Sequence, residues 1–141
     1  LYPAPTSPSA IDAAPAVKAP ALILGAGDLG IFEAGDPSKV AANWGGEVCY
    51  RELEKGNQQG FSEDTMFKLL LGIGSPQTGP QETARGLLTG FLLHQLGSEK
   101  KYKSFSAPDA TAKKVTSYWG EELQEKAYPA DTSPLPFLNN K

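Results

Sequence analysis

The sequence is poor in the residues that build metal centres and disulfide frameworks. Its 141 residues include one cysteine, Cys49, and one histidine, His94. A single cysteine excludes an internal disulfide, and Cys49 is expected to be a small buried apolar residue. One histidine and one cysteine, far apart in the sequence, cannot fill a zinc site without several carboxylates. We therefore predict no metal site.

Long apolar runs and an excess of positive charge are also missing. The most apolar stretch, 86–96, is interrupted by polar side chains and is shorter than the ~18 apolar residues that a membrane span needs. The net charge is −3, with no basic stripe set among aromatic residues, which argues against nucleic-acid binding. The serines lack a nucleophile-elbow context. We predict no catalytic residues.

Proline, in contrast, is abundant and gathers at both ends. Five of the 12 prolines lie in residues 1–20, and three more lie at 129, 134 and 136. Proline fixes φ and removes a backbone donor, which favours extended structure. We therefore predict an extended arm over 1–20, a small domain over 21–127 and a second extended arm over 128–141. Apolar arm residues are predicted to bind partners: Tyr2, Ile11, Val17, Leu135, Phe137 and Leu138.

The middle of the chain carries helix signals. A helix is expected from Asp36-Pro37 to about Gly56, because aspartate caps helices and proline suits the first position. Further helices are expected over 62–72, 80–97 and about 108–127, each with an apolar stripe. The run 21–24 fits either a strand or a buried tether. The predicted fold is mainly α: a small irregular bundle of about four short helices with long Pro-rich arms.

Gly25, Gly27 and Gly30 match the letters of a dinucleotide fingerprint, G-x-G-x-x-G. That motif needs a helix directly after it, whereas residues 31–36 have the composition of a loop. It also needs a parallel sheet built from several βα units. The pattern therefore favours no dinucleotide site.

His94 allows two interpretations. It is a hydrogen-bonded histidine at the boundary of an apolar helix, or it is an axial ligand to a metal-centred pigment. The first is favoured. Carboxylates such as Glu47, Glu52 and Glu54 are expected to be solvated or paired with Arg51 and Lys55.

Residues 50–57 (Tyr-Arg-Glu-Leu-Glu-Lys-Gly-Asn) resemble the first-helix signature of chlorophyll-binding light-harvesting antenna proteins. Asp28-Leu29-Gly30, Asp36-Pro37 and Trp44 are similar to the lead-in of that family. A fainter similarity covers 82–88 (Glu-Thr-Ala-Arg-Gly-Leu-Leu), which resembles its third helix. The resemblance implies that Glu52 and Glu82 are pigment ligands, with Arg85 as the pairing arginine and chlorophyll as the cofactor.

Departures from the family pattern, such as Lys55 in place of a ligand histidine, and the lack of a membrane span indicate a degenerate relative or an associated protein. The expected function is that of a non-enzymatic linker that stabilises a photosynthetic antenna–photosystem supercomplex. Its expected partners are light-harvesting antenna proteins and photosystem core subunits. It would lie at the periphery of the plastid thylakoid membrane, held there by these partners. The alternative is a small soluble ligand-binding or enzymatic helical domain that uses His94 and nearby carboxylates.

Overall fold

The computed structural model describes residues 8–28, 36–57 and 78–130. Strand β2 (Val48–Asn57) is central in a three-stranded sheet. It pairs in parallel with β1 (Ala21–Asp28) and antiparallel with β3 (Val115–Tyr118). The α-helices are α1 (Pro8–Ala13), α2 (Pro37–Ala42), α4 (Thr78–Gly97) and α5 (Gly120–Ala127), and the 3₁₀ helices are η1 (Ala14–Ala16) and η4 (Lys100–Ser106).

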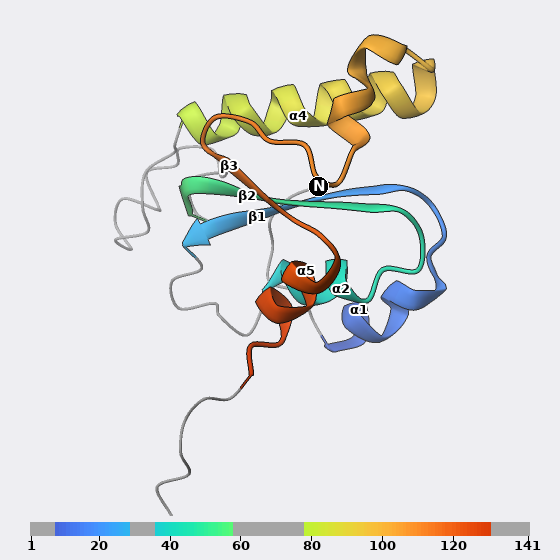
Figure 1. Ribbon diagram of the computed structural model, residues 1–141, viewed down its shortest axis with the longest axis vertical. Helices are drawn as coiled ribbons and strands as arrows, with labels where there is room; N and C mark the ends of the chain where they lie inside the picture. Colours follow the sequence, from blue (N-terminus) through green and yellow to red (C-terminus); the bar gives the residue numbers. More distant parts are fainter. Residues whose placement is uncertain (1–7, 29–35, 58–77, 131–141) are drawn as a thin grey trace, which may run out of the picture.

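The elements form three layers (Figure 1). Helix α4 lies on one face of the sheet, and α2 and α5 lie on the other. The prediction of a mainly α bundle is therefore wrong, because the chain has an α/β fold. The error came from residues 48–57, which lie in a central strand. Both edges of β2 have partner strands, and one of them comes from far along the chain.

Strands β1 and β2 form a parallel pair connected through α2. Parallel strands need a crossover, and a helix usually supplies it. Helix α2 begins where the sequence predicts, because the side chain of Asp36 accepts a hydrogen bond from the amide of Ser38 at 2.8 Å. The predicted continuation to Gly56 is wrong, since α2 ends at Ala42. The chain then passes through Gly45 and Gly46, where a Cβ would overlap the backbone of residues 15–19.

Each face of the sheet has its own apolar core. On the α4 side, Leu87 and Phe91 pack on side chains of all three strands. On the other side, Tyr50 packs with Ala41 of α2 and Leu123 of α5. Strand β2 serves both cores, and residues 49–53 are all buried. This burial on both faces explains why the strand lacks the alternation of a half-exposed sheet.

Helix α4 confirms the helix expected over 80–97 and begins two residues earlier, at Thr78. Helix η4 folds back beside it. The ring of Phe105 lies so close to Gly90 that a Cβ at this position would overlap it. The small residue thus lets η4 pack directly on the helix.

Other expectations are corrected or lie outside the described residues. The N-terminal arm is not extended over 8–16, because α1 and η1 occupy these residues. The helix expected over 108–127 is instead strand β3 followed by the shorter α5. The run 21–24 is a strand. The helix expected over 62–72 and most of the C-terminal arm lie outside the described residues.

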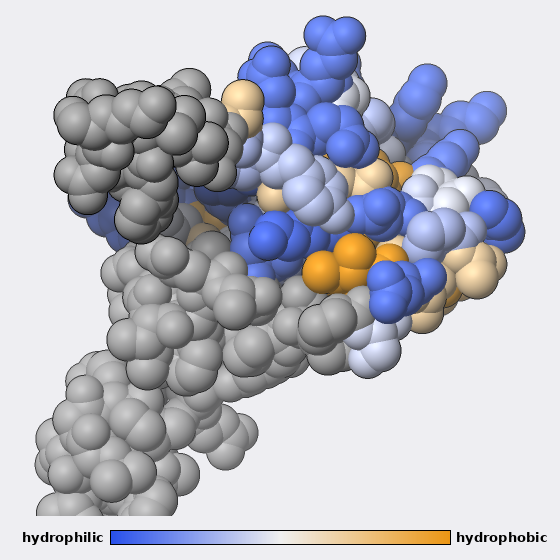
Figure 2. All heavy atoms as spheres, turned by 90° about the horizontal axis from the view of Figure 1, so that it is seen from below, coloured by the Kyte–Doolittle hydropathy of each residue, from blue (hydrophilic) through white to orange (hydrophobic). Residues whose placement is uncertain are grey.

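Figure 2 shows the side of the molecule below the sheet in Figure 1, which carries α2 and α5. The described part of this surface is mostly hydrophilic and has one small hydrophobic area near its centre. On α5 itself, Glu121, Glu122 and Glu125 are all exposed. This view therefore shows no broad apolar surface among the described atoms.

Candidate functional site

A buried arginine fixes the connection that follows η4. The terminal nitrogen Nη2 of Arg51, on β2, donates to the carbonyls of Ser104, Phe105 and Ala107 at 3.1–3.2 Å. These carbonyls lie at the end of η4, where a cation also complements the helix dipole. These three hydrogen bonds therefore connect the sheet to residues 104–107.

Cys49 adds a further contact to the same connection. Its Sγ donates to the carbonyl oxygen of Ser106 at 3.1 Å. Burial raises the pKa of the Cys49 thiol; the charge of Arg51 opposes this effect in part, and the charge of Glu47 adds to it. The thiol is therefore protonated at neutral pH, which makes it a poor nucleophile.

Ser106 makes a second contact through its side chain. Its Oγ lies 2.8 Å from Nδ1 of His94, and both residues are half-buried. Ser106 also lines a cavity of about 290 Å³ between the last turns of α4 and the first residues of β1 and β2. The other lining residues are Pro20, Ala21, Glu47, Val48, Cys49, Phe91, Gln95 and Pro108. Ser106, whose hydroxyl contacts the imidazole of His94, thus lines a small, largely apolar cavity.

A second polar cluster lies on the other face of the sheet. Oε1 of Glu52 accepts from the Tyr50 hydroxyl at 3.0 Å and from Lys126 Nζ at 2.8 Å. Burial lowers the pKa of Lys126, but the hydrogen bond and charge of Glu52 outweigh it and leave the pKa raised. The carboxylate of Glu52 therefore has close partners within the chain.

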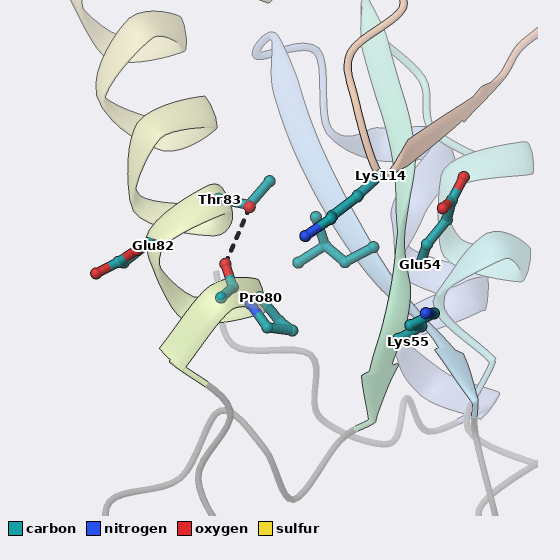
Figure 3. Close-up of a pocket in the computed structure, with 8 residues that line it drawn as sticks. Glu54, Lys55, Pro80, Glu82, Thr83 and Lys114 are labelled. Atoms are coloured by element: carbon teal, nitrogen blue, oxygen red, sulfur yellow. Dashed lines mark hydrogen bonds between the residues drawn. The ribbon is translucent and has the colours of Figure 1, made fainter.

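A larger cavity, of about 480 Å³, lies between the start of α4, the second half of β2 and Lys114, the residue before β3. Figure 3 shows Lys114 extending its amine across the gap towards α4, whereas Glu82 points away from it. The hydroxyl of Thr83 is already engaged, since it donates to the Gly79 carbonyl at 3.0 Å. Two rim residues, Lys55 and Lys114, have left-handed backbones with φ of 59° and 63°. Lys114 is exposed, so the cavity presents a solvated cation rather than a buried polar group.

The side of α4 that faces away from the sheet carries exposed apolar side chains. Leu92, Leu93 and Leu96 are 42%, 37% and 81% exposed. Leu87 and Phe91 of the same helix are buried against the sheet. The expected single apolar stripe on this helix is therefore divided between the core and the surface.

The comparisons leave the family open. No family model, curated protein or solved structure matches this chain.

The structure separates the predicted pigment ligands. His94 is hydrogen-bonded to Ser106 on the α4 side of the sheet, and Glu52 is buried on the other side. Glu82 is exposed on the second turn of α4. The signature-like segment around Glu52 is a strand rather than a helix, and Glu52 pairs with Lys126 rather than with a neighbouring basic residue. The three candidates therefore do not form one site.

The predicted partner-binding residues fall partly within the described chain. Ile11 is half-buried in α1 and Val17 is exposed. Tyr2, Leu135, Phe137 and Leu138 lie outside the described residues. Within the described ranges, no group of three or more histidine, cysteine or acidic residues has metal-binding geometry. No helix in these ranges has both the length and the apolar character to span a membrane.

Sequence reasoning missed the contacts that converge on residues 104–107. Cys49 and Arg51 come from β2 and His94 comes from α4, and their shared target is a connection without a motif of its own. The available signal was weak: a cysteine, a residue type that is usually buried, two positions before an arginine in a segment that can form a strand. The contacts form because Cys49 packs with Leu87 and Phe91 of α4 and η4 lies beside the same helix.

Proposed function

We propose that this chain is an assembly subunit that binds a partner protein through the outward side of α4. The observation that carries the proposal is the exposure of Leu92, Leu93 and Leu96 on one helix. Single exposed apolar residues are normal, but neighbouring ones mark interaction surfaces. This role requires no catalytic centre.

The spacing of these leucines suits helix-in-groove recognition. Residues 92, 93 and 96 lie within about one turn of the helix, so their side chains project to the same side. An amphipathic helix binds a groove through such i, i+3 and i+4 anchors. Covering the exposed part of the three side chains would stabilise a complex by on the order of 3 kcal/mol. That energy is a contribution to binding, and further contacts are required for a stable complex.

The partner class that we propose is the light-harvesting antenna and photosystem core proteins of a plastid thylakoid. Support for this class comes from the resemblance of residues 50–57 and 82–88 to antenna proteins. The strand conformation of 50–57 argues against an antenna helix in this chain, so an associated linker suits the fold better than a pigment-binding antenna protein. Association with the membrane would come from these partners.

The test is co-fractionation of the tagged full chain with detergent-solubilised thylakoid complexes from an alga with chlorophyll a/c antennae. The double variant Leu92→Glu/Leu96→Glu should lose co-migration with the green complexes by about tenfold, because it places two charges in the interface. Val17→Glu is the comparison variant, since Val17 is 37% exposed, close to the 42% of Leu92, but lies directly after η1 in the N-terminal segment.

The two variants distinguish the α4 surface from the N-terminal arm. Loss with the leucine variant and retention with Val17→Glu would support binding through α4. Loss with Val17→Glu alone would support tethering by the arm and contradict the α4 proposal. Failure of the unaltered chain to co-migrate would contradict the choice of photosynthetic partners.

A further inference from the structure

We infer that Ser106 is a nucleophile that His94 activates for acyl transfer from small neutral esters bound in the adjacent cavity. The inference rests on two observations: Ser106 Oγ lies 2.8 Å from His94 Nδ1, and Ser106 lines the cavity of about 290 Å³. It does not rest on the proposed assembly role, which uses the opposite side of α4.

The position of Ser106 is fixed from three directions. Arg51 donates to the carbonyls of Phe105 and Ala107, the residues on either side of Ser106. The thiol of Cys49 donates to the carbonyl of Ser106 itself. His94 contacts its side chain from α4, a helix that packs on the sheet. Catalytic pairs need this kind of support, because a displacement of about 1 Å can reduce the rate by roughly a hundredfold.

The cavity can hold a short acyl group. Val48 and Phe91 give it apolar walls, and its volume lies near the lower end of the ~300–1,000 Å³ typical of ligand sites. Gln95 lines the same cavity and carries an amide donor, the type of group that stabilises an oxyanion. The carboxylate of Glu47 on the lining disfavours anionic substrates, which is why we specify neutral esters.

The choice of Ser106 over Cys49 follows from their surroundings. The thiol of Cys49 is buried, and its hydrogen is donated to a carbonyl. Ser106 is half-buried, and its hydroxyl contacts the imidazole of His94. A serine hydroxyl is a weak nucleophile unless a neighbouring base takes its proton.

The reaction balances with the ester and water alone. Ser106 Oγ forms a bond to the ester carbonyl carbon while its proton passes to His94 Nδ1. The carbon–oxygen bond to the alcohol then breaks, and the alkoxide leaves with that proton. Water next attacks the acyl-serine and gives a proton to Nδ1, and this proton returns to Ser106 Oγ as the carboxylic acid is released.

The experiment uses the full chain, p-nitrophenyl acetate as the ester and an aryl fluorophosphonate as the covalent probe. The probe should modify Ser106, as located by peptide mass spectrometry, and labelling should be lost in urea. Ester hydrolysis should fall about a hundredfold in Ser106→Ala and in His94→Gln. Ser104→Ala is the matched control and should stay within about twofold of the unaltered chain, because its contact with Arg51 uses the backbone carbonyl.

Mapping the probe on the unaltered chain keeps the test decisive if a variant fails to fold. Labelling of Ser106 that depends on the native fold supports the inference. Labelling elsewhere, absence of labelling, or an unchanged rate in folded Ser106→Ala overturns it. Leu92→Glu/Leu96→Glu leaves Ser106 intact, so this variant should lose co-fractionation and keep ester hydrolysis. The two proposals can therefore be contradicted separately.

Discussion

Lys126 Nζ of α5 lies 2.8 Å from Glu52 Oε1 of the central strand and joins the last described helix to the middle of the sheet. The Glu52 side chain is 10% exposed and that of Lys126 is 32% exposed. A carboxylate this buried needs a partner, because removal of one member of a buried ion pair leaves an uncompensated charge.

Lys126→Ala is therefore expected to destabilise the chain by about 1–3 kcal/mol, less than a fully buried pair because the amine is partly solvated. Chemical denaturation measures the change in the free energy of unfolding. Lys113→Ala, at an exposed lysine before β3, is the control and should change it by less than about 0.5 kcal/mol. Equal effects of the two variants would show that the pair contributes nothing specific.

Gly25 is expected to be essential for packing. A Cβ at this position would overlap the Tyr50 hydroxyl and lie 3.0 Å from Tyr50 Cζ, and Tyr50 is fully buried. Gly25→Ala should destabilise the fold by about 1–3 kcal/mol through overpacking. Gly86→Ala, on the exposed side of α4 with open space around it, should instead stabilise by about 0.5–1 kcal/mol. Thermal melts of the two alanine variants should shift in opposite directions.

This pair of variants also bears on the fingerprint-like glycines. Gly25 and Gly27 lie inside β1, where a Cβ at Gly27 would lie 3.2 Å from the Leu53 carbonyl oxygen. Both glycines thus have a packing explanation that requires no nucleotide. A cost of Gly25→Ala in the absence of any ligand would support this explanation.

Stability is expected to fall at alkaline pH. Burial and the charge of Glu52 raise the pKa of Tyr50 above its ordinary 10.0, and burial raises that of Cys49 above 9.0. A group with a raised pKa holds its proton more tightly in the folded chain, so its contribution is complete below the unfolded pKa and is lost as pH rises above it. The free energy of unfolding should therefore decline from about pH 9 and more steeply above pH 10.

The free energy of unfolding should fall by about 1.4 kcal/mol per pH unit for each group that titrates only in the unfolded chain. Denaturation at several pH values measures it. Tyr50→Phe should reduce the slope above pH 10 although it lowers stability at neutral pH. Tyr102→Phe is the control, because it removes a phenol that lies outside the cluster of Tyr50, Glu52 and Lys126. An unchanged slope in Tyr50→Phe would contradict the assignment.

Arg51 should control access to Cys49. Arg51→Ala removes the donor to three carbonyls and frees residues 104–107, whose Ser106 carbonyl accepts the thiol. The rate of Cys49 modification by an aromatic disulfide reagent should rise about tenfold, since the reactivity of a cysteine follows its exposure. Lys103→Ala, on the exposed surface of η4, should leave the rate unchanged. An unchanged rate of Cys49 modification in Arg51→Ala would mean that residues 104–107 keep their position without the arginine.

The sequence was informative where local signals decide the structure. The start of α2 follows from the Asp36 cap, and α4 follows from its apolar spacing. Strand β2 was missed because Val40, Trp44 and Val48 repeat every four residues and mimic a helix. The charged residues of β2 also suggested an exposed segment. Their partners lie far along the chain, since Arg51 contacts residues 104–107 and Glu52 contacts Lys126. The Ser106–His94 contact was equally inaccessible, since it depends on how η4 folds back on α4.

The central position of β2 has a consequence for biosynthesis. During translation, β1 and β2 leave the ribosome well before β3 and α5, because α4 and η4 lie between them in the sequence. For that interval one edge of β2 has unpaired amides and carbonyls, which could recruit a strand from another nascent chain. Charged side chains deter such pairing, and this segment carries Arg51, Glu52, Glu54 and Lys55. Arg51 and Glu52, which bind distant partners in the folded chain, are therefore also expected to disfavour edge-to-edge pairing before residues 104–107 and Lys126 are synthesised.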